Sequence, residues 1–185
     1  MSTMIQRRLF NVEEYCKMEQ VGILAADDRT ELINGEIIKM SPINRPHAYF
    51  VGLLAEVLVS DLRYKAYIGI QSTLYINEYS MPQPDIYVAR FREDRYKNNH
   101  PSAEDTLLII ELADSSRRFD QKVKLKLYAK AGIPEYWIVN IPDEQLEIYR
   151  DPTGEKYALK EVIKKGKEHS LKILDYDFNP AVLFS

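Results

Sequence analysis

The chain has 185 residues, of which 45% are hydrophobic and 29% are charged, as is usual for a globular protein. This length fits a single domain over residues 1–185, and the lone Cys16 excludes an internal disulfide framework and any zinc site built on several cysteines. The formal net charge of -3 removes the argument for nucleic-acid binding that a strongly basic domain would give.

The N-terminal region has no apolar stretch long enough for a signal peptide. No segment approaches the roughly 20 consecutive apolar residues of a membrane span. A single cysteine also suits a reducing compartment. We therefore expect a soluble, cytoplasmic protein that does not enter a membrane.

The first third of the chain predicts a helix, a hairpin and a longer helix. Asn11 followed by Glu14 is a capping-box pattern, which predicts a short helix over about 11–20. The segment TELINGEIIKM, residues 30–40, contains an Asn-Gly pair between two apolar runs and predicts two strands joined by a tight turn. From about 47 to 62, apolar residues recur at helical spacing and predict the second helix.

The middle and the end of the chain predict strands and one loop. Residues 67–78 carry β-branched and aromatic side chains that favour one or two strands, and residues 85–89 predict another. Residues 90–105 are polar and without periodicity, which indicates a surface loop. The C-terminal tail predicts three short strands, QLEIYRD, EKYALKEVI and LKIL, separated by turns.

Between the loop and the tail lies a strand–helix–strand pattern. The apolar runs 107–112 and 135–140 read as buried strands, and the helix between them, over about 120–131, ends at Gly132. Two buried strands joined by a helix are expected to be parallel, with a right-handed crossover. We therefore predict one α/β domain.

Two carboxylates stand at unusual places in this pattern. Glu111 lies inside an apolar strand, where desolvation penalises its charge, so it needs a basic partner, hydrogen-bond donors, solvent at the strand end or a metal ion. Asp85 follows Pro84 and begins another strand, where it is either a turn aspartate or a second site carboxylate.

A lysine on the following helix completes the set. At about 100° per residue, Lys124 and Asp120 fall inside the apolar arc that covers the sheet. The other lysines of this helix fall on the solvent side: Lys122, Lys126 and Lys130. Lys124 therefore either pairs with Asp120 along the helix or enters a site with the two carboxylates, or does both.

Carboxylates from two strands and a lysine are the components of metal-dependent phosphodiester hydrolysis. Hard oxygen ligands bind Mg²⁺ or Mn²⁺, and the metal lowers the pKa of bound water. The order Pro84-Asp85, Glu111 and a nearby lysine resembles the PD-(D/E)XK nuclease signature. The chain resembles more closely one branch of that superfamily, the Uma-two family of restriction-endonuclease-like proteins. The matching segments cover nearly the whole chain: ELINGEIIKMSP (31–42) with His47 following, QPDIYV (83–88), IELADSSRRFD (110–120) and K-x-x-x-Y-x-x-A-G-I-P-E-Y-W-I-V (124–139).

This resemblance implies a restriction-endonuclease-like fold, a mixed central sheet flanked by helices, here with an N-terminal helix and β-hairpin. Asp85 and Glu111 are the implied metal ligands for Mg²⁺ or Mn²⁺. The chain departs from the superfamily pattern at Ala113, where the usual lysine is absent; Lys124 on the next helix is its replacement, a migration that the family shares.

Four further residues are candidates around this core. Glu36 is predicted as a third metal-binding carboxylate, and Glu31 on the opposing strand of the hairpin is the alternative. His47 is expected to contact metal-bound water or phosphate, and Asp120 to support Lys124. The alternatives are a solvated hairpin for the glutamates and a plain helix-start residue for the histidine.

Three basic clusters qualify the negative net charge: residues 117–130, residues 90–97 and residues 160–167. The first two follow the strands that carry the proposed carboxylates and are placed to contact a phosphate backbone. The leading hypothesis is an Mg²⁺-dependent endonuclease acting on DNA, as a homodimer if it cuts both strands. The alternatives are a non-catalytic nuclease-like module that binds nucleic acid or protein, favoured by the displaced lysine, and a hydrolase of another phosphoester.

Overall fold

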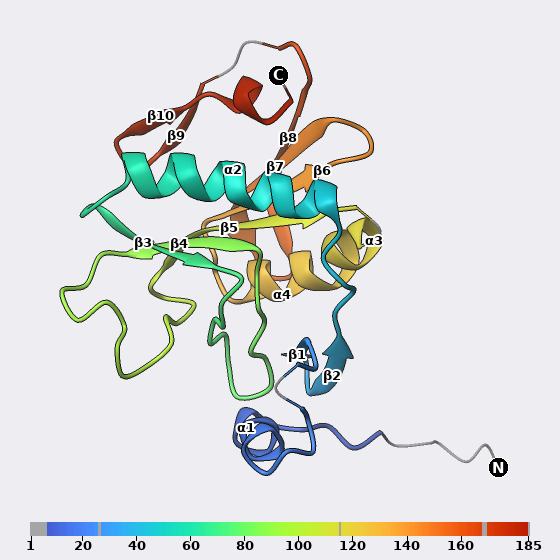
Figure 1. Ribbon diagram of the computed structural model, residues 1–185. Helices are drawn as coiled ribbons and strands as arrows, with labels where there is room; N and C mark the ends of the chain where they lie inside the picture. The colour runs from blue at the N-terminus through green and yellow to red at the C-terminus, as the bar shows by residue number, and fades with distance from the viewer. Residues whose placement is uncertain (1–6, 26, 115, 168–169, 185) are drawn as a thin grey trace.

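A computed structural model describes residues 7–25, 27–114, 116–167 and 170–184 (Figure 1). Its centre is a six-stranded sheet with strand order β3-β4-β5-β6-β7-β8. These strands are β3 (Ala66–Ile70), β4 (Ile86–Arg90), β5 (Thr106–Ala113), β6 (Glu135–Asn140), β7 (Gln145–Thr153) and β8 (Lys156–Lys164). The neighbours β5 and β6 run parallel, as predicted, and the other neighbouring pairs in this sheet are antiparallel. The predicted mixed α/β architecture is therefore confirmed.

Helices cover both faces of this sheet (Figure 1). One face packs against α2 (Arg45–Asp61), and the other against a helical run of three parts: α3 (Arg117–Phe119), a π-helical turn (Asp120–Lys124) and α4 (Leu125–Lys130). Side chains alternate between the faces because the strand period is two: Leu112 of β5 belongs to the core beneath α2, and Ala113 to the core beneath α4. Glu111 shares the face of Ala113, where the helical run lies over it.

The N-terminal residues form α1 (Val12–Gln20) and a hairpin of β1 (Thr30–Ile33) and β2 (Glu36–Lys39). The predicted capping box at the start of α1 is present, and the predicted hairpin turn has two residues with positive φ, Asn34 at 51° and Gly35 at 80°. Strand β1 also forms a bridge to Met81, which joins the hairpin to the segment that leads into β4.

The segment 67–78, expected to form one or two strands, forms one, β3; its remainder makes isolated bridges, such as Tyr75 with Ser102. Two other elements differ from the sequence-based expectation. The helix predicted over 120–131 begins at Arg117. The tail contains β9 (Leu171–Ile173) where a strand was predicted, together with β10 (Tyr176–Phe178) and a 3₁₀ helix (Pro180–Phe184) that were not.

The C-terminal elements extend the core on the α2 face. Strands β9 and β10 pair as a separate two-stranded sheet, and Phe178 and Phe184 pack in the same cluster as Leu54 of α2. Ser115, in the connection between β5 and α3, lies outside the described residues, as do residues 1–6. Among the helices that the structure describes, none is long and apolar enough to cross a bilayer.

Candidate active site

A cavity of about 270 Å³ lies where the start of β4 and the end of β5 meet the β1–β2 hairpin and the first turn of α2. Its lining contains six of the seven residues that the sequence singled out: Glu31, His47, Asp85, Glu111, Asp120 and Lys124. They come from segments spread over about half of the chain. The fold therefore brings together most of the predicted constellation.

Asp85 is fixed by two hydrogen bonds at the entrance to β4. Its Oδ2 accepts a hydrogen bond of 2.8 Å from the backbone N–H of Leu112, and its Oδ1 accepts one of 2.8 Å from Nε2 of His47. His47 itself is positioned by the start of α2, because its backbone N–H is bound by the side chain of the N-cap residue Asn44. Because Leu112 follows Glu111, the first bond ties Asp85 to the end of β5 that carries Glu111.

Glu111 is a buried carboxylate, 4% exposed, on the face of β5 beneath the helical run. Its Oε1 accepts hydrogen bonds from Nζ of Lys124 and from the hydroxyl of Tyr128, each of 2.9 Å. Burial raises the pKa of Glu111 well above its ordinary value, and the ammonium of Lys124 acts in the opposite direction. Lys124 is therefore the basic partner that a buried Glu111 was expected to need.

Lys124 joins two acidic residues from different elements. Its Nζ lies 2.9 Å from Oε1 of Glu111 and 3.2 Å from Oε2 of Glu31, and its side chain is 6% exposed. Burial alone lowers the pKa of Lys124, but the carboxylates of Glu111 and Glu31 outweigh burial and raise it above its ordinary value. The ammonium thus reaches across to the sheet and the hairpin. Lys122, Lys126 and Lys130 are exposed, as the helical wheel predicted.

The two glutamates of the hairpin have different positions. Glu31 is buried and accepts a hydrogen bond of 3.2 Å from the backbone N–H of Gln83, in addition to its pair with Lys124. Glu36 is exposed and pairs with Arg7 at 2.7 Å, and it is not among the residues that line the cavity. The structure does not bring Glu36 to the other carboxylates, so the alternative weighed at the sequence level, Glu31, supplies the hairpin's acid.

Asp120 lies on the π-helical turn one helical turn before Lys124. It is 2% exposed and accepts a hydrogen bond of 2.7 Å from the hydroxyl of Ser116. Burial raises the pKa of Asp120 to about 6, against the opposing effect of Lys124. Asp120 therefore interacts electrostatically with Lys124, although the ammonium of Lys124 forms its direct ion pairs with the two glutamates.

Two contacts of residues that line the cavity were not predicted from the sequence. Tyr128 reads as a core residue of the helix, but its hydroxyl binds Glu111; its spacing of four residues from Lys124 is the one signal that could have indicated this. Asn44, which lines the cavity, donates a hydrogen bond of 2.5 Å to Oδ2 of Asp114, another lining residue, and nothing in the sequence pattern predicts that contact.

The donor chemistry of the cavity suits a small divalent cation. Within the described part of the chain, no three His, Cys, Asp or Glu side chains converge as a ready-made metal cluster. Mg²⁺, however, keeps several waters and is commonly bound through one or two carboxylates together with substrate phosphate. The carboxylates of Asp85 and Glu111, which line the same cavity, suit that requirement.

The mixed sheet with helices on both faces and the acidic, lysine-containing cavity at the ends of β4 and β5 define a protein with a restriction-endonuclease-like fold. The family model Uma2, described as "Putative restriction endonuclease", matches residues 12–182. The chain therefore belongs to the Uma2 family, the Uma-two family that its motifs resemble.

A solved structure supports the same fold. A crystal structure described as "a putative nuclease belonging to DUF820" from Anabaena variabilis superposes with a TM-score of 0.71 over 95% of this chain and 97% of that one. The two sequences are 17% identical, so the likeness concerns the fold. No curated protein matches this chain.

Proposed function

We propose that this protein is a metal-dependent endonuclease that hydrolyses phosphodiester bonds in DNA, using Mg²⁺ or Mn²⁺. The observation that supports the proposal is that Asp85, bound to the N–H of Leu112, lines the same cavity as Glu111 and Lys124. Membership of a family described as restriction endonucleases supports the same class of reaction.

The residues of the cavity divide into ligands and supporting groups. Asp85 and Glu111 would hold the cation, which when bound supplies an acidified water and neutralises charge on the phosphate. Lys124 brings a fixed positive charge that can face a phosphate oxygen or orient the attacking water. His47 and Tyr128 each bind one oxygen of a ligand carboxylate and so fix its direction.

Cations in and around the cavity support a polyanionic substrate. Arg29 and Lys39 line the cavity beside the acids. Among the basic residues of 117–130, those with exposed side chains are Arg118, Lys122, Lys126 and Lys130. Some cations of the predicted clusters form ion pairs and are weaker candidates for phosphate contacts, for example Arg92 with Asp94 and Lys165 with Glu144.

Each chain carries one such cavity among its described residues. Cleavage of both strands of a duplex by one cavity per chain favours two chains acting together, so we propose that the protein cuts duplex DNA as a homodimer. The single cysteine suits the reducing cytoplasm, and we propose that the protein acts there.

A second candidate function is a non-catalytic module that binds nucleic acid or protein. The observation that favours it is Ala113, which occupies the strand position of the superfamily's usual lysine. Lys124 also makes two ion pairs with carboxylates, an arrangement that can simply stabilise a buried cluster.

The test is cleavage of supercoiled plasmid with Mg²⁺ or Mn²⁺ by the wild type, Glu111→Ala and Lys124→Ala. Glu56→Ala is the matched control, because Glu56 is an exposed glutamate of α2. We expect nicking by the wild type and the control, and a large loss in the two site variants. Equal nicking by all four proteins contradicts the proposed site. DNA retardation on a gel without any cleavage favours the binding module.

A further inference from the structure

A second buried glutamate lies on the same face of the sheet as Glu111, outside the candidate active site. The register pairs Glu111 of β5 with Ile138 of β6, and Ile138 with Glu147 of β7. The two glutamates therefore occupy one row across the sheet, two strand spacings or roughly 10 Å apart. Glu147 is 0% exposed.

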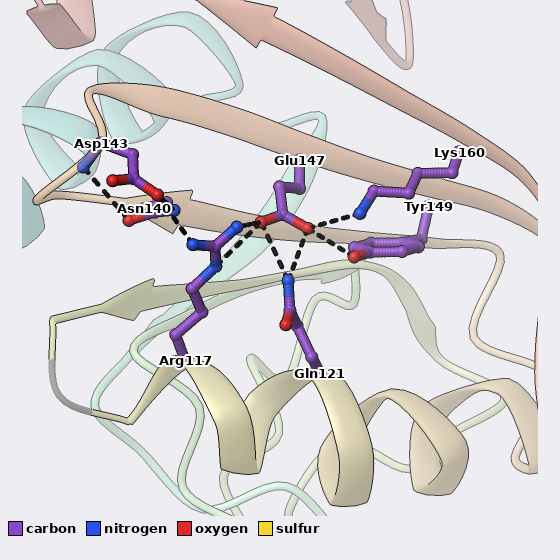
Figure 2. A network of polar contacts seen from close by, with 7 residues as sticks. All are labelled: Arg117, Gln121, Asn140, Asp143, Glu147, Tyr149 and Lys160. Carbon is purple, nitrogen blue, oxygen red and sulfur yellow. Dashed lines mark hydrogen bonds and ion pairs between the residues drawn. The ribbon is translucent and has the colours of Figure 1, made fainter.

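Two side chains of the helical run bind Glu147 (Figure 2). Arg117 donates to its Oε1 from Nε at 3.2 Å and from Nη2 at 2.8 Å. Gln121 donates from Nε2 to both carboxylate oxygens, at 3.0 and 2.9 Å. Asp143, in the turn between β6 and β7, binds Nη1 of the same arginine at 2.7 Å.

Residues of the sheet also bind Glu147 (Figure 2). The hydroxyl of Tyr149 binds Oε2 of Glu147, and Nζ of Lys160 lies 2.9 Å from the same atom. Glu147 is thus held by residues of its own strand and of β8, in addition to those of the helical run. A fixed, fully buried carboxylate is a rigid anchor for whatever binds it, because moving it would leave a charge without partners.

The helical run therefore contacts the sheet at two buried glutamates, Glu147 and Glu111. Arg117 and Gln121, four residues apart, bind Glu147, while Asp120 and Lys124, also four apart, face the cavity that contains Glu111. The two pairs alternate along the run, and all but Arg117 lie in the π-helical turn Asp120–Lys124. Rotation or sliding of the helix that moved Lys124 would have to break the contacts to Glu147.

We propose that Glu147 is a positioning residue that, through Arg117 and Gln121, sets the rotation of the helix carrying Lys124. The proposal rests on the proposed function for its effect on cleavage, but not for its effect on the geometry of Lys124. Glu147 itself touches no group of the cavity in this scheme; it acts only through the helix.

The test compares Glu147→Gln with a matched control on the same strand, Arg150→Gln. Arg150 forms ion pairs with Glu135 and Glu161 and lies on the other face of β7 from Glu147. Gln121→Met is the milder second variant, because it removes bonds to Glu147 and leaves its other partners in place.

The first measurement is acetylation of lysines by an amine-reactive ester, quantified by mass spectrometry. In the wild type we expect Lys124 to be protected relative to the exposed Lys122 and Lys126. Protection of Lys124 should fall severalfold in Glu147→Gln and less in Gln121→Met, and stay unchanged in Arg150→Gln. Unchanged protection in both Glu147→Gln and Gln121→Met overturns the proposal, as does an equal loss in the control.

The second measurement is single-turnover cleavage of DNA. We expect Glu147→Gln to slow cleavage about tenfold, as misplacement of a reacting group does, without weakening DNA binding, and Arg150→Gln to leave the rate unchanged. An equal loss of DNA binding and rate overturns positioning in favour of general destabilisation. If no protein cleaves DNA but the acetylation pattern changes as expected, the proposed function fails and the positioning role remains.

Discussion

Replacing Lys124 by methionine removes a buried ammonium while keeping an unbranched side chain that is only one atom shorter. In the native protein this ammonium lies between Glu111 at 2.9 Å and Glu31 at 3.2 Å, and both carboxylates are less than 6% exposed. Its removal leaves buried acids without their basic partner. We therefore expect Lys124→Met to be one of the most destabilising lysine substitutions in the chain.

The magnitude follows from the burial of the cluster. Removing one partner of a buried ion pair costs about 3–5 kcal/mol. For a chain of this size each kcal/mol lowers Tm by roughly 2–4 °C, so the expected fall is about 10 °C. Lys122→Met, two residues away and exposed, should change Tm by less than about 1 °C, since exposed ion pairs contribute little.

The assay is thermal or urea unfolding of a double-mutant cycle. Glu111→Gln combined with Lys124→Met removes one of the two carboxylate charges that lose their partner, so the double variant should lose less stability than the sum of the single losses. The cycle is run in a metal chelator, so that bound cations do not contribute. Additive losses, or a Lys124→Met variant as stable as the wild type, would refute the buried cluster.

The remaining predictions concern a titration, the hairpin and a tight packing contact. Burial alone raises the pKa of Glu147, but its hydrogen bonds, led by that from Tyr149, hold this pKa at about 2; the lowered pKa contributes about 3 kcal/mol of stability above pH 4.5 that is lost as the pH falls toward 2. The stability difference between wild type and Glu147→Gln in urea should therefore shrink over that range, and a pH-independent difference would contradict this. Glu36→Gln should shift Tm by less than about 1 °C, because Glu36 is exposed in its ion pair; a larger shift would show a buried role. A Cβ at Gly69 would come within 2.0 Å of the ring of Tyr87, so Gly69→Ala should cost about 1–3 kcal/mol in urea unfolding, and an unchanged midpoint would argue against this contact.

Parts of the fold and of the site were predictable because they depend on residues that are close together in the sequence. The capping box of α1 and the Asn-Gly turn depend on neighbouring residues, so their patterns specify them. The helical wheel separated Lys124 from Lys122, Lys126 and Lys130 because the amphipathic period is a property of the helix alone. Glu111 was predictable as a site residue for a similar reason, because it is a charged residue within an apolar strand.

The parts that were missed depend on contacts between distant segments. Glu36 and Glu31 are equivalent in a hairpin pattern, and the bridge of β1 to Met81 and the reach of Lys124 decide which one is buried. Glu147 alternates with Leu146 and Ile148 as a solvent-facing residue of a strand would. Its burial arises from Arg117, 30 residues earlier in the chain, and no local pattern contains that contact.

The most direct test of the proposed active site is the single-turnover rate of DNA cleavage by Asp85→Asn against the wild type, with and without Mg²⁺ or Mn²⁺. The substitution keeps the size of the side chain and removes a ligand charge. We predict that the wild type cleaves only with the divalent cation and that Asp85→Asn is at least about 100-fold slower while still binding DNA. Equal rates for the two proteins, or cleavage by the wild type in a metal chelator, would contradict a metal-dependent nuclease site built on Asp85 and Glu111.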